Sequence, residues 1–213
     1  MVSAEDLERI VHLAHERGIY LLLDECYVYL NYAGKPVSGG SFTWAKEHIV
    51  ILGSLSKTYA MTGWRAGFAL ASKQVVANLS KLQSQSTSNA TSFVQKAAIA
   101  ALAGSQECVS EFRAEFIDLR DYMLKKLAEI PGVTCTKPEG AFYVYPNLSA
   151  YIGKGGTRTA TELATRLLHE GHVVTVPGEA FGTAEHIRIS YPVTKQAIDE
   201  GTRRIAEFVG KLA

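Results

Sequence analysis

An apolar run of strand length at residues 49–53 constrains the fold more than any other feature of this chain. A run that is apolar at every position and is bounded by glycine and serine is typical of a buried strand in a parallel sheet. A second such run, at residues 19–23, follows an amphipathic helical pattern over residues 3–18, in which Ser3 and Asp6 form a capping box. A helix that alternates with buried strands in this way predicts a doubly wound α/β sheet.

Polar residues come directly after both predicted strands. Asp24 ends the first apolar run, and Lys57 lies in the loop just past the second. The carboxyl ends of neighbouring parallel strands lie at one edge of a sheet, and open α/β sheets bind their ligands there. We therefore expect the Asp24 carboxylate and the Lys57 amine to face a common pocket.

The residues around this pair have the chemistry that pyridoxal 5'-phosphate requires. A lysine amine forms a Schiff base with the cofactor aldehyde and afterwards moves a proton, while an aspartate carboxylate keeps the ring nitrogen protonated. Tyr27, three residues after Asp24, can donate to the ring phenolate. Ser54 and Arg65 offer a hydroxyl and a planar cation for the phosphate, and Ser56 is a weaker candidate for the same role.

The second half of the chain predicts a smaller α/β unit. A helical pattern over residues 106–129 is stopped by Pro131 and Gly132. The segments that follow are shorter and alternate between strand and helix patterns. Short strands at 141–145, 173–176 and 187–191 alternate with helices at 159–170 and 194–212. We place the large domain at residues 1–105 and the small domain at residues 106–213, with the long linking helix assigned to the small domain.

Four segments together resemble the class I/II aminotransferases, which are fold-type I pyridoxal phosphate enzymes. In the order in which the family has them, they are LDECY at 23–27, SLSKTYAMTGWRAG at 54–67, PEGAFY at 138–143 and IRISY at 187–191. The sequences of residues 85–89 and 178–182 are most similar to those of aspartate aminotransferase-like members of the family. The resemblance covers most of the chain and implies the C-terminal half of such an enzyme. This half comprises the C-terminal part of the cofactor-binding large domain plus the small C-terminal α/β domain.

The resemblance implies a role for each residue of the first site. Lys57 carries the internal aldimine and Asp24 pairs with the pyridine nitrogen. Tyr27 contacts the phenolate oxygen, and Ser54 and Arg65 bind the phosphate.

Arg188 is implied as the clamp for the substrate α-carboxylate. In a strand, Ile187 and Ile189 face one side and Arg188 faces the other, so its planar guanidinium is able to meet a carboxylate. The implied function is amino-group transfer between an amino acid and a 2-oxo acid, by a homodimer.

Two alternatives remain open. A pyridoxal phosphate-dependent β-lyase or synthase shares the early chemistry, because the reactions branch after the carbanion. The resemblance leaves out the N-terminal half of the family's fold, and a sheet that lacks strands exposes edges and apolar faces. The chain alone is then expected to bind cofactor weakly, or to be a non-catalytic fragment that only folds or associates.

Other functional classes find little support. A formal net charge of +1 gives no reason to expect a nucleic acid or an acidic membrane as partner. No apolar run is long enough to span a bilayer, no secretory signal pattern is present, and the three cysteines are scattered. We therefore expect a cytoplasmic protein. The glycine pattern at 53–58 is incomplete for a nucleotide-binding loop, and the pairs His12/His15 and His169/His172 complete no metal site.

Overall fold

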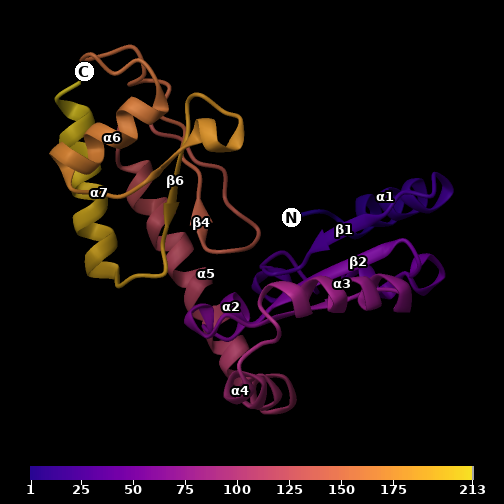
Figure 1. Cartoon of the computed structure of the whole chain (residues 1–213). Helices are drawn as coiled ribbons and strands as arrows, with labels where there is room; N and C mark the ends of the chain where they lie inside the picture. The colour runs from indigo at the N-terminus through magenta and orange to yellow at the C-terminus, as the bar shows by residue number, and fades with distance from the viewer. Residues whose placement is uncertain (213) are drawn as a thin grey trace. The chain divides into compact units, whose positions relative to one another are not determined.

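The computed structural model describes residues 1–212, and the chain divides into two compact units (Figure 1). Unit 1 is Met1–Arg113 and unit 2 begins at Ala114. The division falls inside helix α5 (Glu107–Ala128), later in the chain than the boundary expected at residue 105. Each unit is α/β, with its own sheet and its own core.

Unit 1 has a three-stranded sheet in the order β1-β2-β3. The strands are β1 (Leu21–Asp24), β2 (Ile49–Ser54) and β3 (Gly67–Leu70). β1 and β2 are parallel, as the sequence predicts, and Asp24 lies opposite Leu52. β3 runs antiparallel to β2, with Ser54 opposite Gly67. The parallel pair thus places the ends of β1 and β2 at the same edge of the sheet.

Helix α1 (Ala4–Glu16) covers one face of this sheet. The Ser3 hydroxyl accepts a hydrogen bond from the Asp6 backbone N–H at 3.0 Å and donates to the Asp6 carboxylate at 2.7 Å, which confirms the predicted cap. Leu7 and Val11 of α1 form a small core with Ile49, Ile51 and Ala45, and Leu21, Leu23 and Phe42 pack against it. The helix begins where the capping residues predict and buries the apolar side predicted from the sequence.

The expectation that residues 19–23 are buried on both faces is wrong for the described chain. Exposure alternates along β1, and Leu22 is 63% exposed. The reason is that α1 covers only the face that carries Leu21 and Leu23, and that within residues 1–212 β1 pairs with β2 alone.

Two further helices complete unit 1. They are α3 (Lys73–Ser86) and α4 (Ser92–Ala103), separated by the polar residues at 87–91. α3 buries none of its residues and α4 buries only Val94, so apolar side chains such as Leu82 remain exposed. The face that these two helices offer to the sheet is therefore loosely filled.

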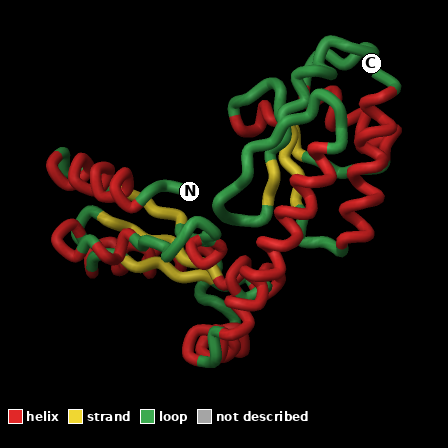
Figure 2. Tube along the Cα trace, turned by 180° about the vertical axis from the view of Figure 1, so that it is seen from behind, coloured by secondary structure: helices red, strands yellow, loops and turns green. Residues whose placement is uncertain are grey.

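Unit 2 has a three-stranded antiparallel sheet in the order β4-β6-β5, packed with three helices (Figure 2). The strands are β4 (Tyr143–Val144), β5 (Val176–Pro177) and β6 (Ile187–Ser190), and the helices other than α5 are α6 (Ala160–Gly171) and α7 (Lys195–Gly210). β4 and β5 are each shorter than predicted. The core is larger than that of unit 1 and includes Leu127, Leu163, Leu167 and Ile205. None of the helices within residues 1–212 is long and apolar enough to cross a membrane.

Candidate active site

The first group of predicted site residues lies at the carboxyl ends of β1 and β2. Asp24 is the last residue of β1 and faces Leu52 across the parallel pair. β2 ends at Ser54, and a one-turn helix, α2 (Leu55–Thr58), carries Lys57 directly after it. Lys57 is thus helical and half-buried, where the sequence predicted a loop. The two strand ends deliver the carboxylate and the amine to one edge of the sheet.

Cys26 connects the two charged groups. Its backbone N–H donates a hydrogen bond to Asp24 Oδ1 at 3.0 Å. Burial raises the pKa of the Cys26 thiol and the negative charge of Asp24 raises it further, while the positive charge of Lys57 and a hydrogen bond with the Ser54 side chain lower it. The charges of Asp24 and Lys57 therefore act in opposite directions on the pKa of the same thiol, that of Cys26.

The turn that holds Lys57 is fixed by hydroxyl groups. Ser54 is the N-cap of α2, and its Oγ accepts a hydrogen bond from the Ser56 backbone N–H at 3.1 Å. Thr62 Oγ1 in turn donates to the Ser56 carbonyl at 3.0 Å. Ser54 and Ser56 are both half-buried beside Lys57. Ser54 and Ser56 thus shape the backbone around the amine, and the Ser54 side chain also hydrogen-bonds Cys26.

Arg65 lies at a strained point of the chain between this turn and β3. Its backbone is left-handed, with φ +53°, which is uncommon for a residue other than glycine. Its Nη1 donates to the Thr62 carbonyl at 2.9 Å, and the side chain is exposed. Such local strain is frequent at binding sites. Arg65 thus reaches back toward the turn that carries Lys57.

Tyr27 and Glu25 follow Asp24 and have different environments. Tyr27 is half-buried and precedes the short helix η1 (Val28–Leu30), which is anchored by the fully buried Leu30. The Glu25 carboxylate accepts hydrogen bonds from the Gly39 N–H at 2.7 Å and from the Ser38 hydroxyl at 3.1 Å. Glu25 therefore anchors a loop behind β1. Its role was missed in the sequence, where nothing links residue 25 to the loop at 38–39.

Arg188 is the predicted site residue of unit 2. The predicted alternation along β6 is confirmed, because Ile187 and Ile189 are buried in the core and Arg188 is only half-buried. The guanidinium carbon lies 4.4 Å from the ring centroid of Tyr143 and 4.6 Å from that of Phe181. Neither ring was recognised in the sequence, although Tyr143 and Phe181 both occur in segments that carry the family resemblance.

The charges of Arg65 and Arg188 are not neutralised by the described chain. Within residues 1–212 neither arginine takes part in an ion pair. An arginine without a carboxylate partner is well suited to bind an anionic group, because its guanidinium offers several donors in a fixed plane.

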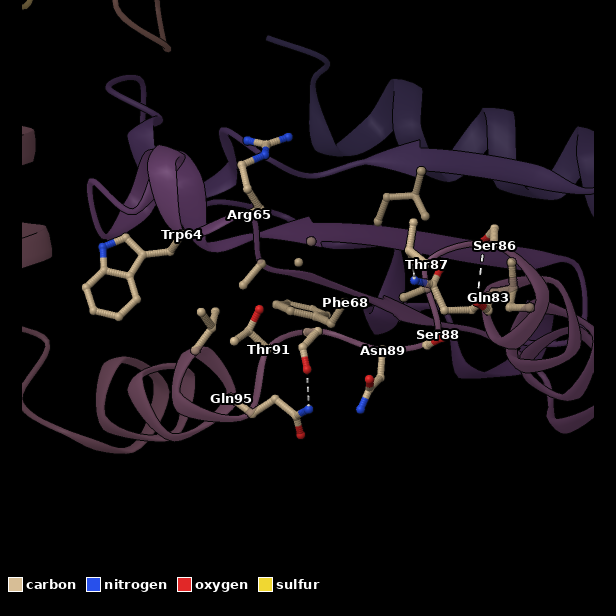
Figure 3. Close-up of a pocket in the computed structure, with 18 of the residues that line it drawn as sticks. Trp64, Arg65, Phe68, Gln83, Ser86, Thr87, Ser88, Asn89, Thr91 and Gln95 are labelled. Carbon is tan, nitrogen blue, oxygen red and sulfur yellow. Dashed lines mark hydrogen bonds between the residues drawn. The ribbon is translucent and has the colours of Figure 1, made fainter.

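Unit 1 also contains a large cavity. It has a volume of about 1400 Å³ and is lined by residues of β2, β3, α3 and α4, among which neither Asp24 nor Lys57 occurs. Apolar side chains such as Phe68, Leu82 and Phe93 share the lining with polar ones such as Asn89 (Figure 3). The Arg65 guanidinium points away from Phe68 in the same view. This groove therefore combines apolar and polar side chains, and its lining includes Arg65 but neither Asp24 nor Lys57.

The predicted histidine pairs contribute no metal centre. Among the residues that the structure describes, no group of three or more His, Cys, Asp or Glu side chains is arranged to hold a metal ion. His12 stacks on Trp44 with ring centroids 4.4 Å apart, and the His15 ring meets the His48 ring edge-on at 5.3 Å. These histidines belong to an aromatic cluster near α1.

Comparisons with known proteins agree with one another. A family model described as aminotransferase class I and II matches residues 1–205. The aspartate aminotransferase of Geobacillus stearothermophilus is 39% identical over 209 residues, which cover 97% of this chain and 53% of the relative. The probable aspartate/prephenate aminotransferase of Aquifex aeolicus is 40% identical over 212 residues, which cover 98% and 53%. The crystal structure of the aspartate aminotransferase from Rhizobium meliloti matches with a TM-score of 0.91 and 31% identity, over 100% of this chain and 55% of that chain. The chain spans about half the length of the curated relatives it matches.

Proposed function

Because the chain belongs to the class I and II aminotransferase family, we propose that it carries out amino-group transfer between an amino acid and a 2-oxo acid. Its α/β architecture is that of the fold-type I aminotransferases, in agreement with the fold class expected from the sequence. The observation that carries the proposal is the position of Asp24 and Lys57 at the carboxyl ends of the adjacent parallel strands β1 and β2. An acid and an amine at the joint end of two parallel strands are the two groups on which this chemistry depends.

The residues at this edge fit pyridoxal phosphate, the cofactor of the family. When bound, the cofactor supplies an electron sink for a carbanion at the substrate Cα. The Lys57 amine would hold the cofactor aldehyde, and after its release it would take the proton from the substrate Cα. The Asp24 carboxylate would hold a proton on the ring nitrogen, with its orientation fixed by the Cys26 N–H.

Three further side chains would complete the cofactor site. The Tyr27 hydroxyl would donate to the phenolate oxygen, and Ser54 and Arg65 would hold the phosphate, with Ser56 as a weaker candidate. One observation supports the phosphate assignment: Arg65 forms no ion pair within residues 1–212.

For the substrate we propose an amino acid whose α-carboxylate is held by Arg188. The half-buried position of Arg188 on β6 and its lack of an ion pair within residues 1–212 support this role. The two curated relatives reported above both carry aspartate in their names, so aspartate is the amino donor we propose first. We also propose a homodimer in the cytoplasm, since three free cysteines suit a reducing compartment.

The experiment compares the purified chain with Lys57→Ala after each has been incubated with pyridoxal phosphate and dialysed. The wild-type chain is expected to retain a visible absorbance band that borohydride reduction turns into a covalent adduct on the peptide containing Lys57. Lys57→Ala should lose both the band and the adduct, while Lys81→Ala, an exposed lysine of α3, should keep both. An identical adduct in wild type and Lys57→Ala would refute the assignment of Lys57.

Assays with aspartate and 2-oxoglutarate then identify the reaction. Formation of glutamate and oxaloacetate indicates amino transfer. A separate assay with S-methylcysteine, whose β-substituent can leave, would indicate a lyase if it released methanethiol, ammonia and pyruvate.

A second candidate is a chain that folds and associates without turnover. The specific observation in its favour is the groove between β3 and the helices α3 and α4, which leaves Leu82 71% and Phe93 66% exposed. A chain that retains the cofactor on Lys57 and yet converts no amino acid at any protein concentration would support this candidate over the first.

A further inference from the structure

We propose that Tyr143 and Phe181 are positioning residues for Arg188, which hold its guanidinium in one plane with the N–H edge open to a substrate carboxylate. The inference rests on the proposed role of Arg188 and deepens it. The two rings come from different parts of unit 2, since Tyr143 lies on β4 and Phe181 ends the short helix η5 (Gly178–Phe181). Their ring centroids lie 4.4 Å and 4.6 Å from the guanidinium carbon of Arg188.

Each ring also has contacts within unit 2 other than Arg188. Tyr143 is paired with Ser190 across β4 and β6, two residues beyond Arg188 on the same strand. The edge of Phe181 meets Tyr145 at a centroid distance of 5.9 Å and an interplanar angle of 88°. Tyr145 itself donates to the Gly178 carbonyl at 3.3 Å, so the loop that ends in Phe181 is tied to β4.

Gly178 shows how closely this loop is fitted. A Cβ at residue 178 would lie 2.5 Å from the His186 carbonyl oxygen and 2.6 Å from that of Thr183, so the backbone approaches too closely for a side chain. Phe181 is nevertheless 47% exposed. An apolar ring held over a cation at the surface by a tightly fitted loop indicates a role in presenting that cation.

The physical effect is preorganisation. Aromatic faces attract a guanidinium and cover its flat sides, while the N–H groups in its plane stay available for a bidentate contact with a carboxylate. A long side chain that is already ordered loses less conformational freedom when the substrate binds. Since Arg188 has no carboxylate partner within residues 1–212, its charge remains available for the ligand.

The test uses the full chain without added cofactor and succinate as the carboxylate probe. Nuclear magnetic resonance follows the Nε–Hε signal of Arg188, which is assigned by its loss in Arg188→Lys. In the wild-type chain this signal should be displaced by the ring currents and should move on addition of succinate. In Phe181→Leu and in Tyr143→Leu, made separately, it should return toward the position of an exposed arginine, and succinate should bind about 3- to 30-fold more weakly.

Conservative variants separate positioning from packing. Phe181→Tyr and Tyr143→Phe retain a ring and should keep the wild-type signal and affinity within about twofold. Tyr122→Leu is the matched control, because Tyr122 is another aromatic residue of unit 2 that contacts cations, at Lys126 and Lys195, and it should change neither reading.

Three results would overturn the inference. They are an unshifted Arg188 signal in the wild-type chain, wild-type affinity in both leucine variants, and no binding of succinate at all. The cofactor experiment with Lys57→Ala is read independently. Loss of cofactor binding together with a normal Arg188 response would refute the proposed activity and leave the positioning role in place. In active protein, the leucine variants should raise KM for the amino acid with little change in kcat.

Discussion

Cys26 makes the meeting of Asp24 and Lys57 measurable in protein without cofactor. Its thiol pKa is raised by burial and by the Asp24 charge and is lowered by the Lys57 charge. Asp24→Asn should therefore lower the pKa of Cys26, and Lys57→Ala should raise it, because each change removes one of two opposing charges. The measurement is the pH dependence of alkylation at Cys26, followed by mass spectrometry.

The control for this titration is Lys81→Ala, which removes a positive charge from α3 and should leave the pKa of Cys26 unchanged. If neither Asp24→Asn nor Lys57→Ala moves the titration, the two charges do not share a neighbourhood, and the site proposed at the edge of β1 and β2 is wrong.

Gly39, in the loop that Glu25 anchors, is a second residue at which an added side chain has a predictable effect. A Cβ there would overlap Leu23 Cδ1, so the Leu23 side chain, which packs against the core of unit 1, would have to shift. Gly39→Ala should reduce the free energy of unfolding by about 1–3 kcal/mol through overpacking, as measured by urea denaturation. Gly201→Ala, in α7 with no atom within 4 Å of the added Cβ, should instead raise it by about 1 kcal/mol. Equal effects of both substitutions would contradict this explanation.

At the scale of elements, helix α7 carries a network of charges whose effect depends on pH. Arg203 and Arg204 hydrogen-bond the Glu200 carboxylate and lower its pKa from the ordinary value of 4.5 to about 2. A lowered pKa in the folded state stabilises the protein above the unfolded pKa, and this stabilisation is lost as the pH falls through the folded value. We expect the stability difference between wild type and Glu200→Gln to shrink between pH 4.5 and about pH 2.

Thermal unfolding at a series of pH values tests this expectation. Glu111→Gln, an exposed glutamate of α5, is the control and should show a smaller dependence on pH. The effect of Glu200→Gln should also diminish with added salt, because surface charges are screened. A difference that stays constant down to about pH 2 would contradict the role of Glu200.

Elements with a local signal were predictable from the sequence. Ser3 and Asp6 form the predicted cap of α1, and the apolar run of β2 gives the predicted parallel pairing. What could not be predicted depends on residues distant in sequence. The burial of β1 depends on which elements cover its two faces. Leu22 is therefore exposed, although the apolar run at residues 19–23 predicts a strand that is buried on both faces.

The same limit applies to the candidate site. The positions of Asp24 and Lys57 at the ends of two parallel strands were predictable from the apolar runs. The burial of Ile187 and Ile189 on either side of the half-buried Arg188 was predictable from strand alternation. The rings of Tyr143 and Phe181 reach Arg188 from separate segments, and only folding reveals that contact. The cofactor and substrate roles of these side chains remain proposals that the experiments above address.

At the scale of the whole molecule, the main feature is apolar surface concentrated in unit 1. Leu82 and Phe93 line the groove beside β3 and are mostly exposed. Contiguous apolar patches of this kind mark sites of association, and an unpaired strand edge adds a row of free backbone groups. We expect sedimentation velocity to show self-association that increases with protein concentration.

Substitutions identify the surface responsible. The double variant Leu82→Lys and Phe93→Ser should reduce the association, whereas Val174→Lys should not, because Val174 is 77% exposed in unit 2 and does not line the groove. A monodisperse monomer at every concentration would contradict this expectation and would also count against the homodimer proposed above.

The free edge of β3 has a practical meaning for anyone who handles the protein. Within residues 1–212 that strand pairs only with β2, so one side of its backbone is left to solvent. Encounters between two such molecules rise with the square of their concentration, and contacts that do not close on themselves continue to grow. Dilute solutions of the protein should therefore stay clear during storage, whereas concentrated solutions should become turbid as the protein aggregates. The time since purification should then affect the result of every assay.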